Sequence, residues 1–270
     1  MKLSISSWSF SHLVLAEAAG VAQALGFAAI DLGYFFKPSL DKSRVLTEPE
    51  NYAAEIRSLL PIQPANLFHL FGDDLEERNL ARGLDPQNQD DMTSVLKFAR
   101  TASIPSVFVL PGMINPGQSR KEAITASAEA LKPLVEAGQH SEIAILVEPH
   151  LGGILNSPEA TLELADRVQG LKIVLDPSHF VAMGYRQPEI EPLASIAGHV
   201  HARQARPGLI QTKMEEGIID FPGFFGTLRE HDYDHWVTIE YEHETGTNSQ
   251  YDDVLSETVK MRDCFRAWLG

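Results

Sequence analysis

Short apolar runs rich in Val, Ile and Phe alternate along the whole chain with longer segments of helical periodicity. The predicted strands lie at 2–8, 28–33, 63–70, 106–110, 143–149, 172–177, 199–203 and 236–241. The predicted helices lie between and after them, at 13–25, 51–60, 90–102, 119–138, 158–168, 188–197, 221–231 and 252–268. Strands that are each followed by a helix predict a single-domain α/β protein, a closed (β/α)8 TIM barrel over residues 1–270.

The alternative fold is an open, doubly wound sheet. Such a sheet usually carries a glycine-rich first turn that binds a nucleotide, whereas the first turn here reads Ser-Trp-Ser-Phe-Ser-His. The closed barrel is therefore the preferred fold. We expect long loops at 34–50 and 71–89, which in a barrel would overhang the mouth.

The charge balance narrows the classes of partner. The chain has 22 Lys and Arg against 37 Asp and Glu, a formal net charge of −15. This charge repels phosphate backbones, so we expect neither nucleic acid nor a membrane as partner. The one cysteine, Cys264, cannot form an intramolecular disulfide, and polar residues interrupt the only apolar run near the N-terminus that resembles a signal peptide. We expect a soluble, cytoplasmic protein, with homo-oligomerisation left open.

Strand alternation places several polar side chains at one end of the predicted barrel. Alternate residues of a barrel strand face the interior, and active sites form where the strands end. In the fifth to eighth predicted strands the apolar residues take the outward positions, which turns four polar side chains inward: Glu148, Asp176, His201 and Glu240. Trp8, at the end of the first strand, also faces inward and is a candidate stacking surface for a small polyol.

Three carboxylates in a confined site repel one another unless a cation neutralises them. Carboxylate oxygens with one imidazole suit a single divalent ion such as Mg²⁺, Mn²⁺ or Co²⁺, with Zn²⁺ as an alternative. The competing interpretation is a set of salt bridges at the rim, with Arg203, Arg206 or Lys213 as partners. Because the alternation places the four residues independently, their convergence favours the metal site.

The motifs that contain these residues resemble those of the xylose isomerase-like TIM barrels, often labelled sugar phosphate isomerases/epimerases. The motifs are Val147-Glu148-Pro149-His150, Leu175-Asp176-Pro177-Ser178-His179-Phe180, His199-Val200-His201 and Ile239-Glu240. Ketose 3-epimerases, hydroxypyruvate isomerases and inosose dehydratases share this order. The resemblance implies that Glu148, Asp176, His201 and Glu240 bind the metal, that both glutamates transfer protons, and that His179 contacts a substrate oxygen.

The resemblance also implies a substrate-binding arginine, and here the chain departs from the family pattern. Ketose epimerases place it six residues after the metal-binding histidine, where this chain has Pro207. Arg206 and Arg203 are both candidates, and we give Arg206 the greater weight because a loop absorbs a one-residue shift. The Asn and Glu that those enzymes carry after the first metal glutamate are absent, which disfavours a ketose 3-epimerase. His150, two residues after Glu148, is a candidate for a substrate contact that those enzymes make with other residues.

Other polar residues receive less specific interpretations. We expect His199 to be a hydrogen-bonded interior histidine and His69 to have a packing role. Asp31, at the end of the second strand, is a candidate for substrate binding or for capping a loop. Glu242 and Glu244 continue the inward series of the last strand, and we expect them to be hydrated.

These observations predict a metal-dependent isomerase or epimerase of a small sugar, keto-sugar or hydroxy-keto acid. Proton loss next to a carbonyl would give an enediolate stabilised by the metal. The same site would suit a dehydratase of the inosose or dehydroshikimate type. Two remoter alternatives are an endonuclease IV-like repair enzyme, whose Asp-x-His pair after the strand-seven histidine this chain lacks, and a non-catalytic sugar-binding barrel.

Overall fold

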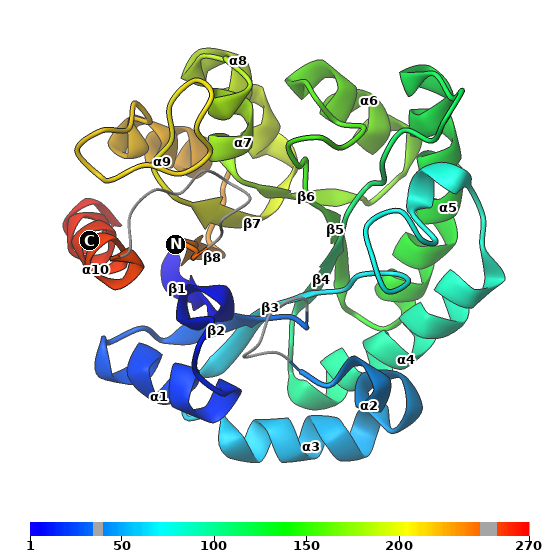
Figure 1. Ribbon diagram of the computed structural model, residues 1–270, viewed down its shortest axis with the longest axis horizontal. Helices are drawn as coiled ribbons and strands as arrows, with labels where there is room; N and C mark the ends of the chain where they lie inside the picture. The colour runs from blue at the N-terminus through cyan, green and yellow to red at the C-terminus, as the bar shows by residue number, and fades with distance from the viewer. Residues whose placement is uncertain (35–39, 244–252, 270) are drawn as a thin grey trace.

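The computed structural model describes residues 1–34, 40–243 and 253–269. Its eight strands pair in chain order and close into a parallel barrel, with β1 hydrogen-bonded to both β2 and β8 (Figure 1). The strands are β1 (Lys2–Ser6), β2 (Ala29–Leu32), β3 (Gln63–Phe68), β4 (Ser106–Val109), β5 (Ala144–Val147), β6 (Lys172–Leu175), β7 (Ala197–Ala202) and β8 (Trp236–Ile239). The predicted (β/α)8 barrel is confirmed.

The helices form a ring around the strands (Figure 1). They are α1 (Leu15–Ala24), α2 (Lys42–Thr47), α3 (Pro49–Leu59), α4 (Pro86–Ala102), α5 (Arg120–His140), α6 (Pro158–Arg167), α7 (Pro177–Ala182), α8 (Gln187–Ile190), α9 (Phe221–Glu230) and α10 (Val254–Leu269). Three 3₁₀ helices join them: η1 (Ser7–Phe10), η2 (Leu80–Arg82) and η3 (Glu191–Ile196). Within the described residues, no helix has the length and apolar character that crossing a membrane requires.

The two predicted long loops are partly wrong. The segment 34–50 contains α2 and the start of α3, while residues 35–39 lie outside the described part of the chain. The segment 71–89 contains η2 and the first turn of α4. Three of these helices, α2, η2 and α4, begin at residues whose side chains cap the first turn: Asp41, Asn79 and Asp85. The side chain of Asp85, for example, accepts a hydrogen bond from the backbone N–H of Gln87 at 2.9 Å.

The region after β6 also differs from the prediction. A short helix, α7, follows the strand directly, because Pro177 suits a first helical position and Asp176 accepts a hydrogen bond from the backbone N–H of Ser178 at 2.8 Å. The helix expected over 188–197 is divided into α8 and η3. Pro192 lies at this boundary, where its missing N–H prevents α-helical hydrogen bonding from continuing.

Two apolar clusters show that the strand alternation is as predicted. The larger one joins the outward side chains of the strands to the helices and includes Ile145, Ile173 and Ile239. The smaller one consists of Phe68, Leu70, Phe108, Leu146 and Val174. The members of this smaller cluster on β3 to β6 have the opposite alternation and so fill the barrel interior. The inward side chains at the strand ends lie above this interior cluster.

Candidate active site

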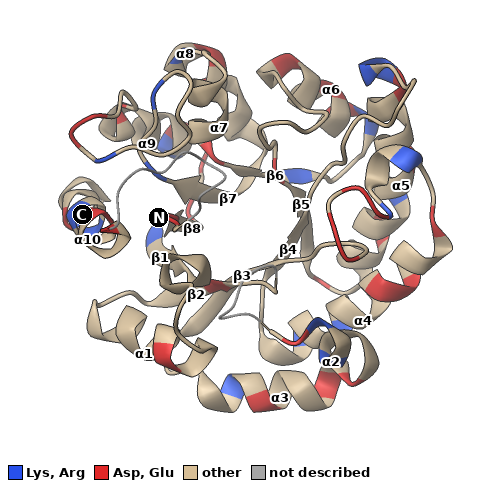
Figure 2. Ribbon diagram, in the orientation of Figure 1, with Lys and Arg blue, Asp and Glu red and all other residues tan. Residues whose placement is uncertain are grey.

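The predicted metal ligands lie where four consecutive strands end. Glu148, Asp176 and Glu240 are the first residues after β5, β6 and β8, and His201 is the next-to-last residue of β7. All four are at most 5% exposed. Figure 2 shows acidic segments within the ring of strands as well as on the outer helices. The barrel therefore brings this set to one end of its interior, at the end where barrel active sites form.

His201 is the centre of the acidic group. Its Nδ1 lies 2.9 Å from Oε1 of Glu148 and 3.0 Å from Oε2 of Glu240, and its Nε2 lies 3.1 Å from Oδ2 of Asp31. Burial alone would lower the pKa of His201, but the charge of Glu240 and the hydrogen bonds to the three carboxylates raise it well above its ordinary value. Two glutamates, one after β5 and one after β8, thus face the same ring nitrogen.

A second network lies on the other side of the His201 ring. Oδ2 of Asp31 is 2.7 Å from Nε2 of His199, which is itself 2.8 Å from the hydroxyl of Thr238. Burial would raise the pKa of Asp31, but His199 and His201 lower it to about 2, so its carboxylate is ionised. His199 is a hydrogen-bonded interior histidine, as predicted. Asp31 does not cap a loop; its carboxylate orients both histidine rings.

Arg203 is buried among the carboxylates. Its Nη2 lies 3.0 Å from Oδ2 of Asp176 and 3.5 Å from Oε2 of Glu240, and its Nε donates a hydrogen bond to the hydroxyl of Ser178 at 3.1 Å. Burial opposes its charge, but Asp176 and the nearby glutamates raise its pKa further, so the guanidinium stays charged. Arg206, the preferred candidate from the sequence, is exposed in the turn that pairs it with Leu209.

The predicted hydration of Glu242 and Glu244, the residues beyond the end of β8, is only partly tested. Glu242 is buried rather than hydrated, and its Oε2 lies 3.6 Å from Nη1 of Arg203. Glu244 lies outside the described residues.

His179 and His150 lie side by side next to Arg203, with ring centroids 4.5 Å apart. Nδ1 of His179 accepts a hydrogen bond from the backbone N–H of Leu151 at 3.0 Å. Burial lowers the pKa of His179 well below its ordinary value, and His150, Arg203 and His201 lower it further. The ring is therefore neutral, and its Nε2 lies 3.3 Å from Nη2 of Arg203 and 3.8 Å from Oδ2 of Asp176.

Trp8 lies in η1, directly after β1, and is half-buried. Its ring meets Phe68 edge-on, with centroids 5.4 Å apart. Together with Asp31, His201 and Glu240, it lines a small hollow in the barrel mouth. The structure therefore places the indole of Trp8 between the acidic group and Phe68.

The acidic group fits a divalent cation. Ligand atoms of Glu148, His201 and Glu240 lie within 4.8 Å of one another, as do those of Glu148, Asp176 and His179. These two groups share Glu148, and a third such group consists of Asp31, His199 and His201. Asp176 is thus grouped with Glu148 and His179, and not with His201 and Glu240. Oε1 of Glu240 is buried without a hydrogen-bond partner among the described residues. Oxygen ligands with one imidazole are typical of Mg²⁺, Mn²⁺ and related ions.

The charge balance supports the same conclusion. Five carboxylates are at most 8% exposed in this region, those of Asp31, Glu148, Asp176, Glu240 and Glu242. Among the described residues, Arg203 is the one arginine or lysine paired with them. Such an excess of buried negative charge is costly unless a further cation compensates it.

Sequence reasoning gave Asp31 as a candidate for substrate binding or loop capping, but did not predict that it holds the two histidines. A usable signal was present, since Ile30 and Leu32 belong to the outer apolar cluster and Asp31 must therefore face inward.

Several solved structures have the same barrel. D-psicose 3-epimerase, solved in the presence of D-fructose, is 15% identical over 100% of both chains, with a TM-score of 0.77. The IolI protein, solved with a bound zinc atom, is 17% identical over 99% of both chains, with a TM-score of 0.75. A probable 3-DHS dehydratase from Bacillus anthracis, AsbF, involved in petrobactin synthesis, is 17% identical over 97% of this chain and 99% of its own, with a TM-score of 0.70.

At such low identities these likenesses show the shared fold alone. A search of curated proteins finds no match. The family is established by its sequence model, which matches residues 19–263. The chain belongs to the xylose isomerase-like TIM barrel family.

Proposed function

We propose that this protein is a divalent-metal-dependent isomerase or epimerase of a small sugar, keto-sugar or hydroxy-keto acid. One observation carries the proposal: Glu148 and Glu240 approach the same nitrogen of His201, at 2.9 and 3.0 Å, from the ends of two different strands. Two buried carboxylates that flank one point can serve a substrate bound between them, one as the base and the other as the acid.

The residues that would hold the metal are Glu148, Asp176, His201 and Glu240. When bound, a divalent ion supplies Lewis acidity, which makes a proton next to a carbonyl easier to remove. The carboxylate of Asp31, 3.1 Å from Nε2 of His201, fixes the ring so that Nδ1 faces the two glutamates.

The glutamates perform the proton transfers. One of them accepts the proton from the carbon next to the substrate carbonyl, and the same or the other glutamate returns a proton. Return to the former carbonyl carbon moves the carbonyl along the chain, which is isomerisation. Return to the opposite face of the original carbon inverts its configuration, which is epimerisation. The electron pair released at carbon returns to carbon in both cases, so no other reactant is needed.

Arg203 and His179 would orient the substrate oxygens. Asp176 and Ser178 hold the guanidinium of Arg203, so its direction is set before a substrate binds. The N–H of Leu151 holds Nδ1 of His179, so that Nε2 points towards the guanidinium of Arg203 and the carboxylate of Asp176. Trp8 offers an apolar face to substrate carbons, and His150 lies at the outer side of His179. Arg203 replaces Arg206 as our preferred anchoring arginine.

The test is a metal-supplemented screen of keto-sugars and inososes in deuterated water, followed by NMR. We expect deuterium to enter at a carbon next to the carbonyl of at least one substrate, together with an isomer or epimer. Loss of water from the substrate would instead identify a dehydratase. A complete lack of exchange across the screen, with metal bound, would favour a binding protein without turnover.

A further inference from the structure

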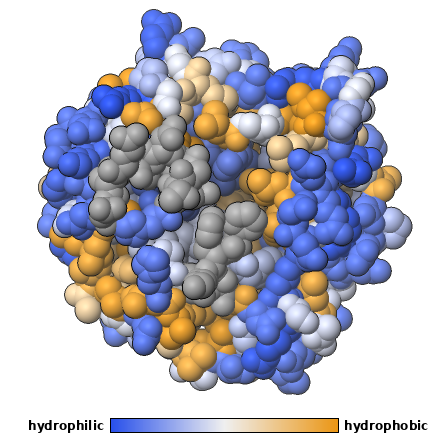
Figure 3. Space-filling model, viewed as in Figure 1, coloured by the Kyte–Doolittle hydropathy of each residue, from blue (hydrophilic) through white to orange (hydrophobic). Residues whose placement is uncertain are grey.

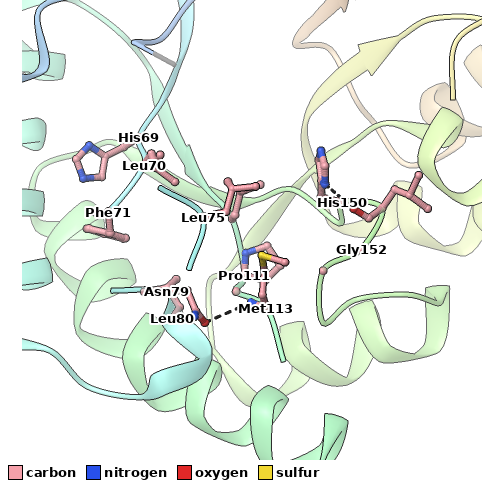
Figure 4. A pocket seen from close by; sticks show the side chains of 14 residues that line it. His69, Leu70, Phe71, Leu75, Asn79, Leu80, Pro111, Met113, His150 and Gly152 are labelled. Atoms are coloured by element: carbon pink, nitrogen blue, oxygen red, sulfur yellow. Dashed lines mark hydrogen bonds between the residues drawn. The ribbon is translucent and has the colours of Figure 1, made fainter. Parts of the chain in front are cut away.

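An apolar pocket opens beside the candidate active site, between the segments that follow β3, β4 and β5 (Figure 4). Its walls include Leu70, Leu75, Leu110, Pro111, Met113 and His150. The empty volume is about 560 Å³, counted with its opening to solvent. In the same orientation as Figure 1, Figure 3 shows apolar side chains at the surface on the side of the mouth where β4 and β5 end.

The pocket adjoins the site at two points. His150 lines the pocket, and its ring centroid lies 4.5 Å from that of His179. Leu70 lines it too and belongs to the interior cluster with Phe108, whose ring centroid is 5.5 Å from that of His201. A substituent on a ligand held at the acidic group would therefore have the pocket beside it, past the paired rings of His150 and His179.

The pocket offers few groups to a hydroxyl, one of them the buried Nε2 of His69, which has no hydrogen-bond partner among the described residues. None of the described residues that line it is Asp, Glu, Lys or Arg. The side-chain oxygen of Asn79 already accepts hydrogen bonds from the backbone N–H groups of Ala81 and Met113, at 3.1 and 3.3 Å. Nδ1 of His150 lies 2.8 Å from the carbonyl of Leu151, and Figure 4 shows His69 at the far side of the pocket from His150.

This arrangement opposes a substrate that carries hydroxyl groups along its whole length. A hydroxyl buried here would lose its hydrogen bonds to water and would contact mainly leucine, proline and methionine side chains. Burying a polar group without a hydrogen-bond partner is costly in free energy. An aryl or alkyl group would instead gain the free energy of apolar burial. The two regions therefore suit the two ends of an amphipathic molecule.

We propose that the substrate is a keto-sugar that carries an apolar substituent, such as the aryl or alkyl aglycone of a keto-glycoside. This inference rests on the proposed function, since it assigns the hydroxy-ketone end to the acidic group. The apolar substituent occupies the pocket of Leu70, Leu75, Leu110 and Met113. A free ketohexose is then a poorer ligand than a glycoside.

The experiment compares methyl and phenyl 3-keto-β-D-glucopyranoside as ligands of the metal-supplemented protein by titration calorimetry. The two probes share the hydroxy-ketone and differ only in the aglycone. We expect the phenyl glycoside to bind at least about tenfold more tightly, a preference that needs burial of only about 55 Å² of additional apolar surface. Met113→Gln, and separately Leu75→Gln, should remove most of the preference. Both residues are half-buried, so the main core is left intact.

Ile114→Gln is the matched control, because Ile114 is the neighbour of Met113, is 39% exposed and does not line the pocket. It should keep the preference of the wild type. Equal binding of the two probes, or a preference that both pocket variants retain, would overturn the inference.

Deuterium exchange with the same probes tests the proposed function separately. Exchange of both probes with no aglycone preference would support the reaction and reject the apolar subsite. An aglycone preference that depends on Met113, without any exchange, would support the subsite and reject the reaction.

Discussion

The two sides of the barrel mouth are built from the same strand geometry but from opposite chemistry. At the ends of β5 to β8, inward positions carry Glu148, Asp176, His201 and Glu240, with Arg203 buried between them. At the ends of β3 and β4, the inward positions carry Phe68 and Phe108 and lead to the apolar pocket. The comparison shows how one rim can separate the reacting groups from the groups that select the substrate.

The largest effect should come from the charged side. Replacing Glu148 or Glu240 with Gln retains a carbonyl oxygen but removes the base, so we expect turnover to fall by about 10²–10⁴-fold. Substrate affinity should fall much less. Deuterium exchange rates and calorimetric dissociation constants measure the two quantities. A Glu240→Gln enzyme within threefold of the wild-type rate would contradict the two-glutamate mechanism.

The two arginines provide the next comparison. Arg203→Lys keeps the charge but loses the planar group that contacts Asp176, Glu240 and Ser178, so kcat/KM should fall by about 10–100-fold. Arg206→Lys is the matched control, and we expect less than a twofold change because Arg206 is exposed. Thermal unfolding of both variants separates a loss of folding from a loss of function. The reverse order of effects would return the anchoring role to Arg206.

Asp31→Asn should weaken the metal site without removing a ligand. The amide leaves the histidine rings of His199 and His201 without the carboxylate that orients them, and such a loss typically costs about 10–100-fold in metal affinity. Titration with Mn²⁺, followed by calorimetry, measures the effect. Unchanged affinity, with the fold intact by circular dichroism, would show that Asp31 does not position His201.

The smallest effect concerns a histidine on the apolar side. Burial, with a smaller effect of Arg78, lowers the pKa of His69 to about 3, and its Nδ1 is hydrogen-bonded to the hydroxyl of Tyr34. In the unfolded chain the pKa is about 6.5, so the unfolded state takes up a proton that the folded state rejects as the pH falls below that value. Stability present above pH 6.5 is therefore lost on acidification, by about 2 kcal/mol between pH 7 and pH 5.

Urea denaturation at a series of pH values tests this. His69→Gln should lower the pH dependence of the unfolding free energy by that amount, whatever its effect at neutral pH. If the variant and the wild type lose stability in parallel, His69 does not contribute as described.

The sequence could predict the acidic group because strand alternation is a strict geometric rule. This alternation alone predicts that Glu148, Asp176, His201 and Glu240 lie at one end of the barrel. It could not choose between Arg203 and Arg206, because the choice depends on where β7 ends and how the following turn is folded. The apolar pocket could not be predicted from the sequence either. Three separate segments build its walls, and their contacts leave no periodic pattern in the sequence.

The central claim is that the charged side of the mouth holds one metal ion. Metal analysis after chelation and reloading with Mn²⁺, Mg²⁺, Co²⁺ or Zn²⁺ tests it most directly. We predict about one divalent ion per chain, with affinity strongly reduced in Glu148→Gln and Glu240→Gln. A protein that binds none of these ions, or that binds three zinc ions per chain, would contradict the account.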